Sequence, residues 1–167
     1  MKKGFMEAIE GRRGEIKRKW ELLLRAAPAT TPLGNPDALV YLMDESLDQL
    51  FTLFHGRTSH PCSRAHLAAK GLGTDCHCRL NPLINYFISG QTALGFAAQE
   101  IPRSELRLDD VTTTACIDEL IVVFRLLAHR EIRAFCEICQ YSPMNARAAG
   151  IDGKSVCPLT PADLGRN

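Results

Sequence analysis

Long apolar runs are missing from this sequence. No run reaches the roughly eighteen apolar residues that a membrane-spanning helix needs. The opening stretch, MKKGFMEAIEGRRGEIKRKW, contains basic residues, but charges interrupt its apolar positions throughout. This pattern predicts an amphipathic helix rather than a signal peptide. We therefore expect a cytoplasmic protein with no membrane partner.

The sequence also lacks an excess of charge of one sign. Its 20 Lys and Arg residues nearly balance its 19 Asp and Glu residues, which leaves a formal net charge of +1. Glutamates interrupt a basic cluster near the N-terminus, as is typical of an exposed helix face with ion pairs. A nucleic-acid interface would need a one-sided basic patch, so we expect no nucleic-acid partner. The cluster comprises Arg12, Arg13, Lys17, Arg18 and Lys19.

Strand patterns and catalytic motifs are equally scarce. No stretch alternates cleanly between apolar and polar residues, and few stretches are rich in β-branched and aromatic residues. The motifs HExxH, GxSxG, GxGxxG and the P-loop are all missing. We therefore expect an all-α protein that binds or regulates rather than an enzyme.

Four segments carry apolar residues at helical spacing. An asparagine followed by proline opens the second and third segments, at Asn35-Pro36 and Asn81-Pro82. This pair combines a helix-capping side chain with the residue best tolerated at the first helical position. The fourth and longest pattern begins at Ser104 or Asp109. The four patterns cover residues 5–24, 35–56, 81–101 and 104 or 109 to 138.

These four helices have mostly short connections, which favours a four-helix up-down antiparallel bundle. A globin-like packing is the alternative, because it uses the same periodicity. Residues 1–141 are predicted to form a single helical domain. Residues 142–167 have few apolar anchors and are predicted to be an irregular C-terminal tail packed on the surface. A short helix is also expected within residues 63–71.

Seven cysteines in a chain expected in a reducing compartment indicate metal or redox chemistry more than a disulfide framework. Two close pairs stand out, Cys76 with Cys78 and Cys136 with Cys139. Structural zinc is commonly held by two such pairs from different chain segments. If the third and fourth helices are antiparallel neighbours, the start of one lies beside the end of the other. The sequence therefore predicts a zinc site formed by all four thiolates.

Other interpretations of these cysteines remain open. Four thiolates can also bind an iron–sulfur cluster, or the thiols could be redox-active without a metal. The remaining alternatives are a disulfide and cysteines that are simply buried in the core. A further alternative is a metal-dependent enzyme, in which histidines of residues 55–79 bind a metal ion that keeps one coordination position open. Cys116 is predicted to be a buried core residue, and His129 to be solvated. The additional candidate ligands are His77, Cys62, His60 and His66.

One stretch resembles a known family. The residues that carry this resemblance are the tryptophan in the first predicted helix (Trp20), Pro28 with Thr31, and Asn35-Pro36 followed by Leu47 and Leu50. Over residues 9–98 the chain resembles the N-terminal sensor domains of RsbR/RsbRD-type bacterial stress regulators. The resemblance implies a bundle-like or globin-like input module, usually without haem, that signals through protein contacts. We therefore expect a regulatory or interaction module with an unidentified protein partner, and a homodimer remains an option.

Overall fold

The computed structural model describes residues 2–28, 34–55, 81–102, 106 and 108–138. Within these ranges the secondary structure is entirely helical, which confirms the predicted fold class. No helix in the described ranges is long and apolar enough to cross a membrane. The predicted tail (142–167) and the short helix within 63–71 lie outside the described residues. The elements are α1 (Lys2–Gly11), α2 (Arg13–Ala26), α3 (Pro36–Leu39), the 3-10 turn η2 (Val40–Leu42), α4 (Met43–His55), α6 (Pro82–Gln99) and α8 (Asp110–Ile138).

The N-terminal pattern forms two helices, although the sequence predicts one. Arg12 separates them with φ −94° and ψ 11°, and this ψ is far from the helical value. The backbone N–H of Arg12 still donates to Ile9, and its carbonyl accepts from Ile16. The chain therefore bends without losing these hydrogen bonds. Gly11, which ends α1, favours such a bend because glycine is a weak helix former.

The starts of α3, α6 and α8 agree with the sequence. The Asn35 side chain accepts a hydrogen bond from the backbone N–H of Asp37 at 3.0 Å, and Asn81 accepts one from Leu83 at 2.9 Å. Asp109, rather than Ser104, caps the last helix, because its carboxylate accepts from the backbone N–H of Thr112 at 2.8 Å. These bonds satisfy donors that a helix start leaves without partners. The bonds to Thr112 also lower the pKa of Asp109.

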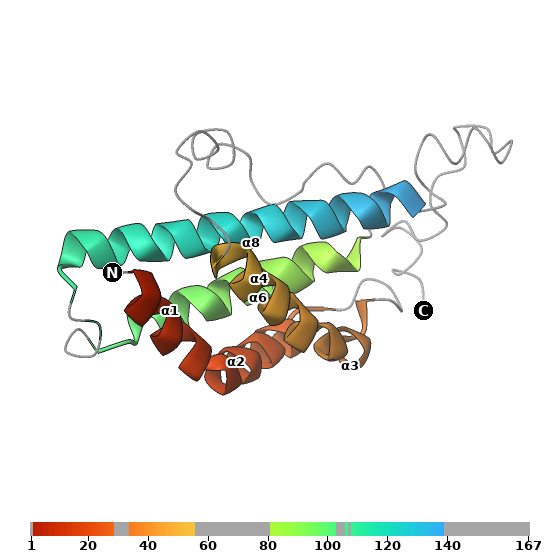
Figure 1. Ribbon diagram of the computed structural model, residues 1–167. Coiled ribbons are helices and arrows are strands. Elements are labelled where there is room, and N and C mark those ends of the chain that lie inside the picture. The colour runs from red at the N-terminus through yellow and green to blue at the C-terminus, as the bar shows by residue number, and fades with distance from the viewer. Residues whose placement is uncertain (1, 29–33, 56–80, 103–105, 107, 139–167) are drawn as a thin grey trace, which may run out of the picture.

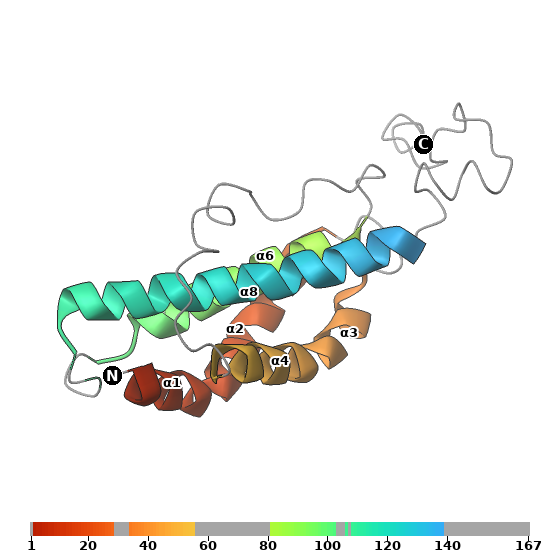
Figure 2. The ribbon, with the colours of Figure 1, turned by 45° about the horizontal axis from the view of Figure 1, so that its top comes forward.

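Helices α6 and α8 lie side by side and run in opposite directions in both ribbon views (Figures 1 and 2). The contacts agree, because Asn81 at the start of α6 meets the late residue Ile132 of α8, and Gln91 accepts from Arg125. Helix α2 packs along α6, and α4 contacts α8. The antiparallel pairing of the third and fourth predicted helices is therefore confirmed.

The core centres on an aromatic cluster. The Trp20 ring is fully buried, and its centroid lies 4.6 Å from that of Tyr86 and 5.6 Å from that of Phe124. Its indole N–H donates to the Tyr86 carbonyl at 2.8 Å. Phe87 completes the cluster at 5.0 Å from Tyr86 and 5.5 Å from Phe124. One tryptophan thus joins α2 to both long helices.

Gly90 makes this approach possible. A Cβ atom at position 90 would lie 2.5 Å from one Trp20 ring atom and 2.7 Å from Phe124 Cζ. Both distances are well below van der Waals contact. The tryptophan ring therefore occupies the space that any larger residue would need.

Ion pairs join α2 to α4 at the surface. Arg13 contacts Asp44 at 2.9 Å and Asp48 at 2.5 Å, and Lys17 contacts Asp44 at 2.5 Å. Hydrogen bonds from Lys17 and Arg13 lower the pKa of Asp44. The interpretation of the basic cluster as an ion-paired helix face is therefore confirmed for these residues and for Arg12, which contacts Glu15 at 3.0 Å.

Candidate functional site

Only part of the predicted zinc site falls within the described residues. Cys136 lies on the last turns of α8 and is partly buried against the core. The other three predicted thiolate ligands and all four additional candidates lie outside the described ranges. Among the residues that the structure does describe, no group of three or more His, Cys, Asp or Glu side chains could hold a metal ion. The residues outside are Cys76, Cys78, Cys139, His77, Cys62, His60 and His66.

Asn81 holds Cys136 at the start of α6. The Asn81 side chain is 5% exposed and makes three polar contacts. Its oxygen caps α6, while its amide nitrogen donates to the Ile132 carbonyl at 3.3 Å and to the Cys136 sulfur at 3.4 Å. One buried side chain thus fixes the beginning of α6 against the end of α8.

We expect Asn81→Ala to lower the free energy of unfolding by about 1–2 kcal/mol. The variant loses the α6 cap and also leaves the Ile132 carbonyl without this buried donor. Asn35→Ala is the matched control, because Asn35 caps α3 in the same way but is exposed. Urea denaturation followed by circular dichroism measures both changes. An equal or smaller effect at Asn81 would contradict the importance of its contacts with α8.

The environment of the His129 side chain differs from the predicted one. Its side chain is partly buried rather than solvated, and the buried Nε2 atom has no hydrogen-bond partner among the residues that the structure describes. Cys116, in contrast, is 4% exposed within the core, as predicted. The sequence could have suggested that His129 is shielded, because it directly follows the core residues Leu127 and Ala128.

A small cavity of about 100 Å³ lies between α4, α6 and α8. At its wall the hydroxyl groups of Ser46 and Tyr86 are 3.0 Å apart. Burial raises the pKa of Tyr86 well above its ordinary value. The phenol therefore stays neutral and acts as a hydrogen-bonding group in the core. Glu45, Gln49 and Glu131 form the polar part of the rim.

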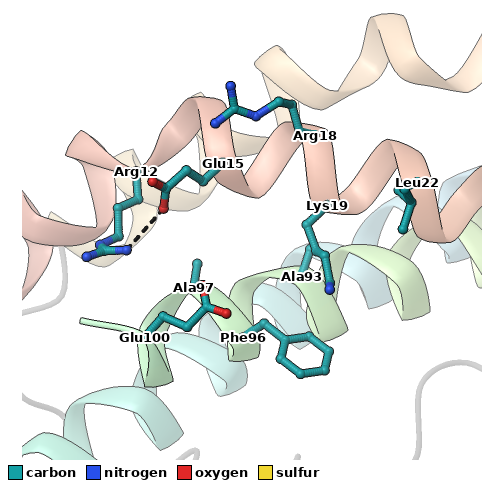
Figure 3. A pocket seen from close by; sticks show the side chains of 9 residues that line it. All are labelled: Arg12, Glu15, Arg18, Lys19, Leu22, Ala93, Phe96, Ala97 and Glu100. Carbon is teal, nitrogen blue, oxygen red and sulfur yellow. Dashed lines mark hydrogen bonds and ion pairs between the residues drawn. The ribbon is translucent and has the colours of Figure 1, made fainter. Parts of the chain in front are cut away.

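A larger groove of about 460 Å³ lies between α2 and α6 (Figure 3). Its apolar residues include Leu22, which is 63% exposed, and Phe96, which is 44% exposed. The Lys19 ammonium lies 4.6 Å from the centroid of the Phe96 ring. The sequence alone does not reveal this groove, because it exists only once α2 and α6 have packed together.

Comparisons with protein-family models, curated proteins and solved structures find no match for this chain. The functional argument therefore depends on the chemistry of the chain's own residues.

Proposed function

We propose that this chain is a helical regulatory or protein-interaction module in which Cys76, Cys78, Cys136 and Cys139 bind one structural zinc ion. The contact between Asn81 and the Cys136 sulfur carries this proposal. It fixes one thiol of the second pair at the helix start that directly follows the first pair in the sequence.

Chain length supports the meeting of the two pairs. Cys78 precedes Asn81 by three residues, and three residues span at most about 11 Å. Cys76 is two residues further away. The two thiols of the first pair are therefore tethered close to the point where Cys136 is held. The CxxC spacing of Cys136 and Cys139 is one at which two thiolates bind the same zinc ion.

The donor set favours a structural role. Four thiolates fill the tetrahedral coordination of zinc, whereas catalytic zinc keeps one position for water or substrate. Residues 56–80 contain few large apolar side chains, so this segment has little apolar surface that it could bury. A zinc ion joining this segment to the end of α8 would supply binding free energy that stabilises the fold.

The proposed domain is a packed helical input module, arranged as a four-helix up-down bundle or in a globin-like way. The resemblance of residues 9–98 to RsbR/RsbRD-type sensor domains supports a role in signalling through protein contacts. The burial of Trp20 and the cap at Asn35 give structural roles to two residues on which that resemblance depends.

We expect Cys136→Ser to lower zinc content and thermal stability together. A serine hydroxyl is a poor zinc ligand, and the loss of metal removes the free energy that binding contributes to folding. Elemental analysis of anaerobically purified protein and a thermal melt of the same sample measure both quantities.

Cys116→Ala is the matched control, because Cys116 is buried near the start of α8, at the opposite end of the helix from Cys136. This variant should lose a little stability and keep its zinc. Full zinc occupancy in Cys136→Ser would contradict the assignment of that ligand. Iron with acid-labile sulfide in the wild-type protein would instead support a redox function.

A further inference from the structure

The groove between α2 and α6 combines exposed apolar side chains with cations. Its lining extends along α2 from Arg12 to Leu22, which corresponds to about 15 Å of helix. Ala93 and Ala97 of α6 face it with small side chains, and Phe96 with a large one (Figure 3). Its length and shape suit about three turns of a helix lying between the two ridges.

Two of the groove's cations lack a carboxylate partner. The other three cations on α2 each have one, namely Arg13 and Lys17 with Asp44, and Arg25 with Glu21. Arg12, just before α2, contacts Glu15. No ion pair is formed by Arg18 or Lys19 within the part of the chain that the structure describes. Lys19 instead contacts the face of Phe96 (Figure 3). A cation over an exposed aromatic ring presents both charge and apolar surface to a ligand.

The negative charges of the groove lie towards its other end. Glu15 points to Arg12, and Glu100 follows the last residue of α6 (Figure 3). The end of the groove lined by Lys19, Leu22 and Phe96 is therefore both positive and apolar, and Arg18 adds a second positive charge on the side of α2 that is turned away from α6 (Figure 3). A ligand complementary to this end has acidic groups beside large apolar ones.

The chain's own remaining segments do not have this chemistry. Residues 56–80 contain four basic residues and one acidic residue, Asp75. Residues 139–167 contain three basic residues and two acidic residues, Asp152 and Asp163. Both segments therefore carry a net positive charge, which the positive end of the groove would repel. The complementary helix therefore belongs to another protein.

We propose that the α2–α6 groove binds an acidic amphipathic helix of a partner protein. Apolar side chains of the partner pack on Leu22 and Phe96, and its carboxylates meet Arg18 and Lys19. This gives the proposed interaction module a binding surface. The surface does not require the zinc ion, so either proposal can fail without the other.

A display library of helical peptides of about 14 residues, enough to span the groove, tests this proposal on the full chain. We expect the recovered peptides to carry acidic residues beside apolar residues at i, i+3 or i+4, and i+7. Phe96→Asp and the double variant Arg18→Glu with Lys19→Glu should each weaken their binding by about tenfold or more. The double variant should gain affinity for peptides in which lysine replaces the acidic residues.

Two exposed positions on other helices provide matched controls. Val111→Asp introduces the same charge at a side chain that is 81% exposed on α8. Lys3→Glu reverses a charge on α1, where the side chain is 85% exposed. Both variants should bind the recovered peptides within about twofold of the wild type, because neither position lines the groove. Thermal melts confirm that every variant is folded.

Three results would overturn the proposal. The library could yield no peptides of the acidic amphipathic class, or such peptides could bind the groove variants as tightly as the wild type. In the third result, peptide binding is weak, and the same variants instead abolish either binding to vesicles containing phosphatidylserine or self-association measured by sedimentation velocity. That result would assign the groove to a membrane surface or to a second copy of the chain.

Discussion

Replacing Trp20 by alanine is expected to lower the free energy of unfolding by about 3–5 kcal/mol. The side chain is fully buried, contacts the rings of Tyr86 and Phe124, and donates a hydrogen bond to the Tyr86 carbonyl. Alanine would leave a cavity at the point where α2 meets both long helices. The loss of a single side chain should therefore weaken the packing of α2 against both long helices.

Urea denaturation followed by far-ultraviolet circular dichroism measures this loss. Leu22→Ala is the control, because position 22 is on the same helix but 63% exposed, and its effect should stay within about 0.5 kcal/mol. If the alanine variant does not fold, Trp20→Phe keeps an aromatic ring and should show a smaller loss. A change below about 1 kcal/mol for Trp20→Ala would show that the cluster is not central to stability.

Gly90→Ala should also destabilise the fold, by about 1–3 kcal/mol. A methyl group there would overlap the Trp20 and Phe124 rings, and both rings are fully buried. The clash outweighs the gain of about 0.5–1 kcal/mol that alanine usually gives over glycine inside a helix.

Gly95 provides a direct comparison within the same helix. A Cβ atom at position 95 would have no atom within 4 Å. Gly95→Ala should therefore stabilise the protein by about 0.5–1 kcal/mol, through helix propensity alone. The two substitutions are chemically identical, so opposite signs would isolate the close approach of Trp20. A stabilising Gly90→Ala would contradict this packing.

The helix starts could be predicted because their causes are local. Asn35, Asn81 and Asp109 each accept a hydrogen bond from a backbone group two or three residues away. The break at Arg12 could not be predicted from apolar spacing. Ile9 and Ile16 are seven residues apart, close to two full turns, so the apolar stripe continues as if the helix were unbroken.

Features that depend on packing were harder to predict. Gly90 gives Trp20 room to approach, but a Cβ atom at Gly95 of the same helix would have no atom within 4 Å, so a glycine within a helical pattern does not by itself predict close packing. The α2–α6 groove likewise depends on how two helices far apart in sequence come together. For the candidate zinc site, the sequence correctly predicts that the start of α6 meets the end of α8, and Cys136 is held there.

Elemental analysis of the full chain after anaerobic purification, together with a visible absorption spectrum, tests the central claim most directly. We predict about one zinc ion per chain, the stoichiometry of a four-thiolate site, and a colourless sample. Iron with acid-labile sulfide and visible absorption would contradict the zinc assignment and indicate a redox protein. A protein that contains no metal would contradict the four-thiolate site itself.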